Sequence, residues 1–220
     1  MQQFEVFKPP LMKKACITTF VILVICHTYS HAQIPDKFAF GIKAGLNYMD
    51  TRLAQRPKNQ ILYLTGVRGS DGYQAGVWAS LPIRKWIFLD TDLEFSNLGQ
   101  ERYIPRTDTV VGRNRYHYLG LSTRLGATYR GAFVSLGPQI NLQLNRNTFI
   151  SEPVPVFWGL NARMGYQYRQ IRAEVFYTKG LSHYDVNTEN KELGRKILFF
   201  GKTVGFSLGW QLLGGKKDSR

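Results

Sequence analysis

Residues 37–49, KFAFGIKAGLNYM, alternate between two kinds of side chain. From Phe38 to Tyr48 every second residue is apolar, and the residues between them are small or polar, mostly glycine, lysine and asparagine. A period of two predicts a β-strand whose two faces meet different surroundings. A soluble sheet turns its apolar face inward, whereas a membrane barrel turns it outward toward lipid, so the pattern alone leaves both folds open.

The same alternation recurs along the chain and predicts eight strands. They are residues 37–49, 73–81, 87–96, 116–127, 133–145, 156–167, 171–182 and 198–212. Lys202 interrupts the apolar face of the last strand, where we expect a local bulge.

The connections between these strands alternate in length. Three are short turns, around Pro82–Lys85, Tyr129–Gly131 and Tyr168–Gln170. Four are longer, residues 50–72, 97–114, 146–155 and 183–196. An even strand number puts both chain ends and all short turns at one end, as in outer-membrane barrels with short periplasmic turns. The predicted fold class is all-β, an eight-stranded antiparallel up-and-down transmembrane β-barrel.

The volume of the side chains indicates which face is outside. The apolar faces carry roughly three dozen large side chains, whereas an eight-stranded barrel has an interior just wide enough for side chains or one small ligand. The apolar faces therefore point out, into lipid. The alternative is a soluble two-sheet sandwich or a lipocalin-like cup.

Aromatic residues near the strand ends agree with a membrane barrel, because such rings form girdles at both membrane interfaces. At the long-loop end we expect Tyr48, Tyr73, Phe95, Trp158 and Phe200, and at the short-turn end Phe38, Tyr166 and Trp210.

Residues 1–32 have the order of a secretory signal peptide, with Met12 as a second candidate start. A basic stretch at residues 12–14 precedes the uncharged run Ala15–Cys26, and Ser30-His31-Ala32 forms a small-x-small cleavage site. The apolar run is shorter than the ~20 residues of a spanning helix. Residues 33–213 then form the barrel, and 214–220 a polar C-terminal tail.

Both cysteines, Cys16 and Cys26, lie in the signal, so the mature chain has no disulfide. Lipidation of Cys26 is a weaker alternative, because that chemistry prefers a small residue where Ile25 stands. Removing the signal lowers the net charge from +14 to +12, since it deletes three lysines and one glutamate. We expect outer-membrane lipid and lipopolysaccharide as partners, with envelope proteins as further candidates and no nucleic acid.

Three segments carry a family resemblance: the signal end Ala32-Gln33, the first strand FGIKAGLNY and the fifth strand SLGPQINLQLN. They resemble the PorT-like outer-membrane β-barrel proteins of Bacteroidetes, over about residues 35–213. The resemblance implies an eight-stranded barrel in the Gram-negative outer membrane, often of unknown role. The founding member is tied to type IX secretion, a role that we do not transfer. The C-terminus departs from the usual pattern: outer-membrane barrels often end on an aromatic residue, whereas here Trp210 is followed by Gln-Leu-Leu and the tail.

Eight charged residues fall on the polar faces of the predicted strands. They are Lys43, Asp90, Asp92, Glu94, Arg124, Arg163, Arg172 and Glu174. Buried charges must be paired or hydrated, so we expect a plug of salt bridges that fills the barrel. The alternative makes the three acids of the third strand a cation path or metal site, although roughly 6–7 Å separates successive acids along the strand.

The sequence contains no P-loop, no zinc-ligand spacing and no glycine-rich phosphate loop. Ser182, His183 and Asp185 come nearest to a catalytic set, but Ser182 and His183 are strand neighbours and point to opposite faces. We therefore expect no catalytic residues, no cofactor and no metal.

The long predicted loops are basic and suggest a clamp for lipopolysaccharide phosphates, against the alternative of ordinary solvated loops. The residues concerned are Arg52, Arg56, Lys58, Arg68, Arg102, Arg106 and Arg113. The predicted function is a small closed outer-membrane barrel with a structural, adhesion or envelope-assembly role and no catalytic activity. Alternatives are a narrow pore or transport protein and a lipid-modifying outer-membrane enzyme.

Overall fold

The computed structural model describes residues 38–53, 66–104, 107–145, 151–183, 185–187 and 197–214. The predicted signal peptide, the candidate start at Met12 and residues 215–220 of the tail lie outside the described residues. No helix in the described part of the chain has the length and apolar character needed to cross a bilayer.

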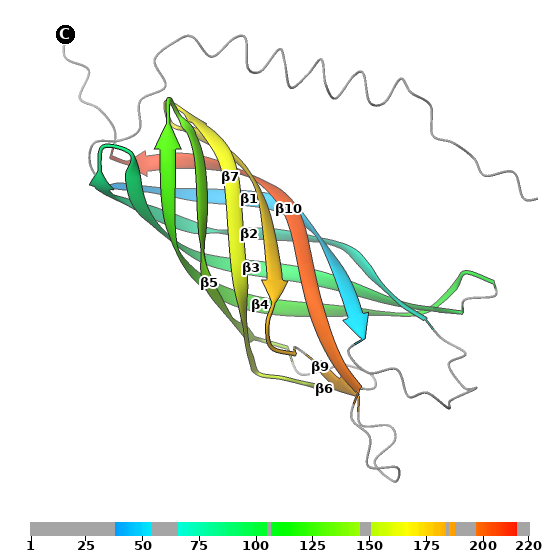
Figure 1. Cartoon of the computed structure of the whole chain (residues 1–220). Coiled ribbons are helices and arrows are strands. Elements are labelled where there is room, and N and C mark those ends of the chain that lie inside the picture. The colour runs from blue at the N-terminus through cyan, green and yellow to red at the C-terminus, as the bar shows by residue number, and fades with distance from the viewer. Residues whose placement is uncertain are drawn as a thin grey trace, which may run out of the picture. The chain divides into compact units, whose positions relative to one another are not determined.

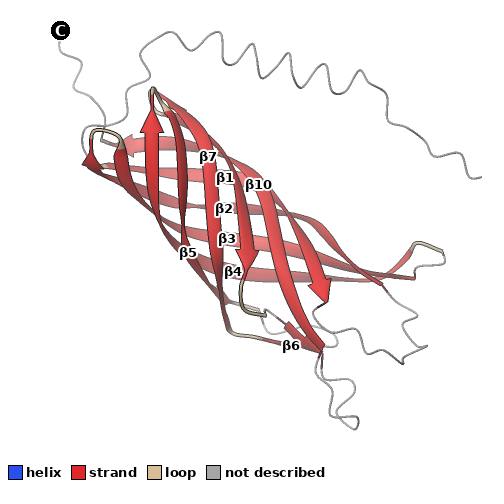
Figure 2. Cartoon of the chain, in the orientation of Figure 1, coloured by secondary structure: helices blue, strands red, loops and turns tan. Residues whose placement is uncertain are grey.

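Eight long antiparallel strands form a closed ring, in which each pairs with the next and β10 pairs with β1 (Figures 1 and 2). They are β1 (Ala39–Leu53), β2 (Gly66–Arg84), β3 (Ile87–Ile104), β4 (Thr109–Tyr129), β5 (Ala132–Gln143), β7 (Val156–Tyr168), β8 (Ile171–Gly180) and β10 (Ile197–Leu213). Two short strands, β6 (Ser151–Pro153) and β9 (Asp185–Asn187), pair with each other, and β9 also pairs with the start of β10. The predicted eight-stranded up-and-down barrel is confirmed.

The predicted loop at residues 97–114 is wrong, because most of it is strand. β3 continues to Ile104 and β4 begins at Thr109, so the two form a hairpin that extends beyond β5. The outward face of this extension carries mostly polar side chains, and the inward face mixes polar with apolar ones such as Leu98 and Tyr116. The period-two signal that marks the membrane part is therefore lost.

The expected loop at 50–72 contains the end of β1, up to Leu53, and the start of β2, from Gly66. The expected loops at 146–155 and 183–196 likewise contain the short strands β6 and β9.

The bulge expected at Lys202 is also wrong. Lys202 stands in regular register opposite Asp50 of β1 and Lys179 of β8. It lies near the outer end of the barrel, where a charged residue on the outer face requires no break in the ladder. The register shift in the pairing of β10 with β1 lies instead near the end of β10, between the pairs Gly41–Gln211 and Phe40–Leu213.

The apolar faces point outward along the strands, as the volume argument predicts. In β5 exposed and buried residues alternate without exception, with Val134, Leu136 and Ile140 outside and Ser135 and Gln139 inside. Leu46 of β1 is 71% exposed, which in water would be costly for a leucine. A closed ring with this exterior is a transmembrane barrel.

The lumen also contains large aromatic rings, which the volume argument did not anticipate. Four of these rings lie directly opposite a glycine on the neighbouring strand. The pairs are Trp78 with Gly41, Phe88 with Gly126, Phe133 with Gly165, and Phe176 with Gly205. A Cβ atom added at any of these glycines would come within 2.3–2.7 Å of the facing ring. Each ring therefore occupies the space that a side chain at the facing glycine would fill.

Gly126→Ala tests this packing, because its Cβ would lie 2.3 Å from Cζ of Phe88 and the closest atoms to it all belong to that ring. Overpacking of this kind costs about 1–3 kcal/mol, and we expect that loss in urea unfolding of the barrel in micelles. Adding Phe88→Leu should restore part of it. Gly112→Ala is the matched control, because its Cβ meets nothing within 4 Å; an equal loss there would contradict the packing argument.

Candidate functional site

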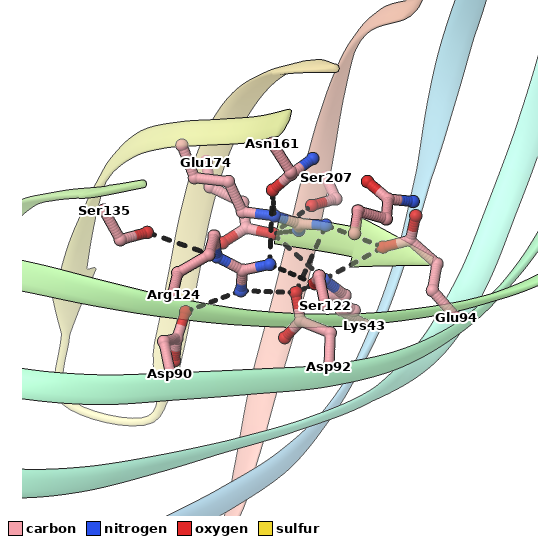
Figure 3. A network of polar contacts seen from close by, with 12 residues as sticks. Lys43, Asp90, Asp92, Glu94, Ser122, Arg124, Ser135, Asn161, Glu174 and Ser207 are labelled. Atoms are coloured by element: carbon pink, nitrogen blue, oxygen red, sulfur yellow. Dashed lines mark hydrogen bonds and ion pairs between the residues drawn. The ribbon is translucent and has the colours of Figure 1, made fainter. Parts of the chain in front are cut away.

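Eight charged side chains from five strands meet at the centre of the lumen (Figure 3). They are the eight residues that the sequence analysis singles out: Lys43, Asp90, Asp92, Glu94, Arg124, Arg163, Arg172 and Glu174. Strand alternation turns each of them inward, and none is more than 5% exposed. Four are acids and four are bases, so the group is neutral as a whole.

Asp90 holds one side of this network. Its carboxylate accepts two hydrogen bonds from the guanidinium of Arg172, at 2.7 and 3.1 Å, and one from Arg124 at 2.8 Å. A two-bond contact of this kind between arginine and a carboxylate fixes geometry as well as charge. Arg124 also donates to Asp92 at 2.5 Å, which links Asp90 to the remaining acids.

Lys43 and Arg163 hold the other side. The Lys43 ammonium lies 2.7 Å from Asp92, 3.0 Å from Glu94 and 3.4 Å from Glu174. Arg163 contacts the same three acids, with 3.2 Å to Asp92 and 2.9 Å to Glu94. Arg172 donates to Glu174 at 3.0 Å. Every acid therefore contacts at least two bases and every base at least two acids, in one connected network.

Neutral polar groups add hydrogen bonds to two of the ions, Arg124 and Glu174. Arg124 donates to Ser135 at 3.3 Å and to Asn161 at 3.2 Å, and also to Ser122. Ser207 donates to Glu174 at 2.9 Å. These bonds occupy donors and acceptors that the ion pairs leave free, which buried ions need in order to offset their desolvation.

The lumenal aromatic rings lie against the arginines. The Arg172 guanidinium is 4.2 Å from the centre of the Phe133 ring and 4.8 Å from that of Trp78. Arg163 lies 5.2 Å from the Phe176 ring. Cation–π contacts at these distances are attractive and are strongest when the cation is desolvated. Three of the four rings that lie opposite glycines, Trp78, Phe133 and Phe176, thus also line the charged centre.

A second, apolar layer closes the lumen on the outer side. Its members are Met49, Leu98, Tyr116, Tyr118 and Phe157. Tyr118 and Phe157 meet edge to face at 4.9 Å, and Tyr116 donates to Gln100 at 2.8 Å. Beneath this layer is a cavity of about 30 Å³ that Gln74, Glu94 and Thr178 help to line. That volume holds on the order of two water molecules, so the lumen is filled at two levels.

The arrangement of the acids favours pairing over metal binding. Among the described residues, no group of three or more His, Cys, Asp or Glu side chains is arranged to hold a metal ion. The acids of β3 have Lys43 and the arginines between them, where a metal ion would have to sit.

In the candidate catalytic set, the Ser182 hydroxyl accepts a hydrogen bond from the backbone N–H of Trp158 at 2.9 Å.

The basic residues of the predicted phosphate clamp separate into two groups. Arg68 and Arg113 lie on the strand extensions, where both contact Glu101, at 3.0 and 2.9 Å, and Arg68 also contacts Asp108 at 3.0 Å. The hydrogen bond from Arg68 holds the pKa of Glu101 below its ordinary value and raises that of Arg68. Arg56, Lys58 and Arg106, and the side chains of Arg52 and Arg102, lie outside the described part.

The aromatic girdle residues occupy the outer face to different extents. Five of them are 41–54% exposed: Phe38, Tyr48, Tyr73, Trp158 and Trp210. Phe95 and Tyr166 are half-buried. Phe95 lies 6.4 Å from the Tyr73 ring and stacks on His117 at 5.8 Å. The side chain of Phe200 lies outside the described residues.

The sequence analysis missed three exposed aromatic residues at the short-turn end. Trp86, Tyr129 and Tyr168 are 58%, 70% and 43% exposed, and each stands in or beside a turn. The sequence pattern that could have identified them is a basic residue next to each ring, because lysine or arginine precedes or follows the aromatic residue in all three turns.

No family model and no curated protein sequence matches the chain. Among solved structures, the chain is similar to the outer membrane protein OprG from Pseudomonas aeruginosa, with 10% identity, a TM-score of 0.51, and coverage of 82% of this chain and 98% of OprG. Outer membrane protein AlkL matches with 12% identity, a TM-score of 0.46, and coverage of 85% and 97%. The likeness to OprG concerns the fold.

The fold and the exterior together give the location. An eight-stranded barrel with an apolar outer band and short turns at one end is of the outer-membrane type. The chain is an outer-membrane β-barrel protein.

Asp90→Asn tests the network, because it removes one charge while keeping the shape of the side chain. It leaves Arg172, which is only 3% exposed, with one acid fewer, and breaking a buried pair costs about 3–5 kcal/mol. We expect that loss in urea unfolding of the barrel in micelles. The double variant Asp90→Asn with Arg172→Gln should lose less than the two single variants together, since it restores neutrality.

Glu101→Gln serves as the control outside the lumen, where the partner arginines Arg68 and Arg113 are 40% and 67% exposed and ion pairs contribute little. Strict additivity of the Asp90 and Arg172 variants, or a stability unchanged by Asp90→Asn, would contradict a coupled network.

Proposed function

We propose that this protein is a closed, non-conducting anchor in the outer membrane, with a structural, adhesive or assembly role in the envelope and no catalytic activity. The observation that carries this proposal is the ion network across the lumen, in which each of the eight charges contacts at least two of opposite sign. Membership of the PorT-like barrels of Bacteroidetes is part of the proposal, supported by the sequence resemblance.

The energetics of the network favour an anchor over a pore. A polar solute that crossed the centre would have to separate buried pairs such as Arg124–Asp90 and Arg163–Glu94. Each separation costs about 3–5 kcal/mol when no water replaces the lost partner. The aromatic layer around Tyr118 and Phe157 would have to move as well. Both barriers lie in series along the same axis.

The anchor carries a projecting hairpin on its outer side. The last pair between β4 and β5 is Tyr118 with Gln143, and the side chain of Asn145 bonds the next part of β4 at Arg115 and His117. Beyond that point no described strand lies beside β4 on this edge, from Thr109 to Asn114. A free strand edge is a template for strand addition by another protein. We propose envelope proteins as partners at this edge, and membrane lipid and lipopolysaccharide around the barrel.

Planar-bilayer recording tests the closed barrel. We expect no steady single-channel steps from the purified, refolded protein, because the ion network and the apolar layer both occupy the lumen. Shortening two plug residues of opposite charge, Arg163→Ser with Glu94→Ser, keeps the lumen neutral and should introduce brief openings. Steady steps from the unchanged protein would favour the narrow-pore alternative.

Site-specific photo-crosslinking in intact cells tests the projecting edge. A crosslinker at Val111, which is 52% exposed on this part of β4, should form an adduct with a discrete envelope protein. The matched position is Leu208, which is 53% exposed on the lipid-facing wall and should give no such protein adduct. Identical adduct patterns from both positions would count against a partner at the β4 edge.

A further inference from the structure

The three short turns at the periplasmic end share one design. Each presents an exposed aromatic ring with a cationic side chain next to it in sequence: Lys85-Trp86, Tyr129-Arg130 and Tyr168-Arg169. In two of them the guanidinium lies over the neighbouring ring, 5.2 Å from that of Tyr129 and 5.4 Å from that of Tyr168. We call these six residues the basic rim.

Backbone hydrogen bonds join the turns into one continuous rim. The N–H of Thr128 donates to the carbonyl of Trp86 at 3.0 Å, and the N–H of Gln167 donates to the carbonyl of Gly131 at 2.8 Å. The rings therefore follow one another along the wall formed by β3, β4, β5 and β7, at the level where aromatic side chains meet lipid headgroups.

Turn geometry does not account for the two arginines. Arg130 and Arg169 have φ angles of 50° and 52°, in the left-handed region. Gly or Asn adopts that conformation at lower cost than other residues and is the usual choice in two-residue hairpin turns. The backbone conformation therefore does not explain why these two positions carry long cationic side chains.

The charge of this end is uncompensated among the described residues. It carries Arg84, Lys85, Arg130 and Arg169. The acids whose side chains are described all lie in the lumen or toward the outer end: Asp50, Asp71, Asp90, Asp92, Glu94, Glu101, Asp108 and Glu174. An anionic ligand is the partner that such a rim fits.

An apolar groove begins at this rim and runs along the lipid-facing wall. Its volume is about 720 Å³, and Trp86 lines it at the rim end. The small side chains of Ala127 and Ala162 lie among larger neighbours such as Met164 and Tyr177, all of which line the groove. The outward-facing side chains that line it are apolar, so its occupant within the bilayer is hydrocarbon.

We propose that the groove and the basic rim together bind an anionic phospholipid of the periplasmic leaflet. One acyl chain lies in the groove past Trp86, and the phosphate lies between the arginines of neighbouring turns. The short turns mark the periplasmic side, which excludes lipopolysaccharide of the outer leaflet as the occupant. The net negative headgroup distinguishes this lipid from zwitterionic ones of the same chain length.

Native mass spectrometry of the full purified barrel tests this site with two probes, dioleoyl phosphatidylglycerol and dioleoyl phosphatidylcholine. We expect preferential retention of one phosphatidylglycerol. Arg130→Asn with Arg169→Asn suits the turn conformation and removes both charges. It should lower the preference about fivefold for each arginine, the ratio that corresponds to about 1 kcal/mol per basic residue near an anionic surface.

Three further variants separate charge, shape and position. Lysine at both turn positions should keep the preference, because it keeps both charges. Ala162→Phe fills the groove and should weaken retention of both lipids equally. Arg113→Asn with Lys179→Asn removes two charges from the outer half and should leave the preference unchanged.

Several outcomes would overturn the proposal. Equal retention of the two lipids by the unchanged protein would do so, as would a preference that survives the double asparagine variant or falls equally in the outer-half control. A lipid-free dimer that Ala162→Phe abolishes would assign the groove to a second copy of the chain instead.

Discussion

The structure depends on one constraint: inside a bilayer, a polar group cannot form a hydrogen bond with water and must find its partner within the protein. The backbone meets this requirement by closing the ring between β1 and β10, which leaves no strand edge in the hydrocarbon. The side chains meet it in the lumen, where four acids and four bases neutralise one another. Ring closure and charge neutrality are therefore two consequences of the same solvent.

The glycines connect these two levels. Gly41 and Gly165 leave room for Trp78 and Phe133, and both of those rings lie against Arg172. A barrel of eight strands has little interior space, so a ring enters only where the facing strand has no side chain. The position of the arginine, and through it Asp90 and Glu174, thus depends on where the wall carries glycine. Wall composition and lumen chemistry cannot vary independently.

The strands of the membrane part could be predicted from the sequence and the strand extensions beyond it could not, for a physical reason. Alternation predicts strands only where the two faces meet different solvents, so the lipid-facing segments were predictable and the extension of β3 and β4 into water was not. Alternation also identifies which charges point inward. It does not identify their partners, because the contact of Arg172 with Asp90 joins residues on β8 and β3 that are far apart in sequence and around the ring. Alternation turns Trp78 and Phe88 inward, but it does not show the glycine on the neighbouring strand that makes room for each ring.

Charge is distributed differently in the three levels of the barrel. The lumen is neutral, and in the outer extension Arg68 and Arg113 meet Glu101 and Asp108. The net charge of +14 in the whole chain must therefore lie elsewhere. Part of it lies at the periplasmic turns, where cations stand beside exposed rings and no described acid offsets them. Because ion pairs neutralise the centre and much of the outer hairpin, the periplasmic rim carries most of the excess positive charge of the described side chains.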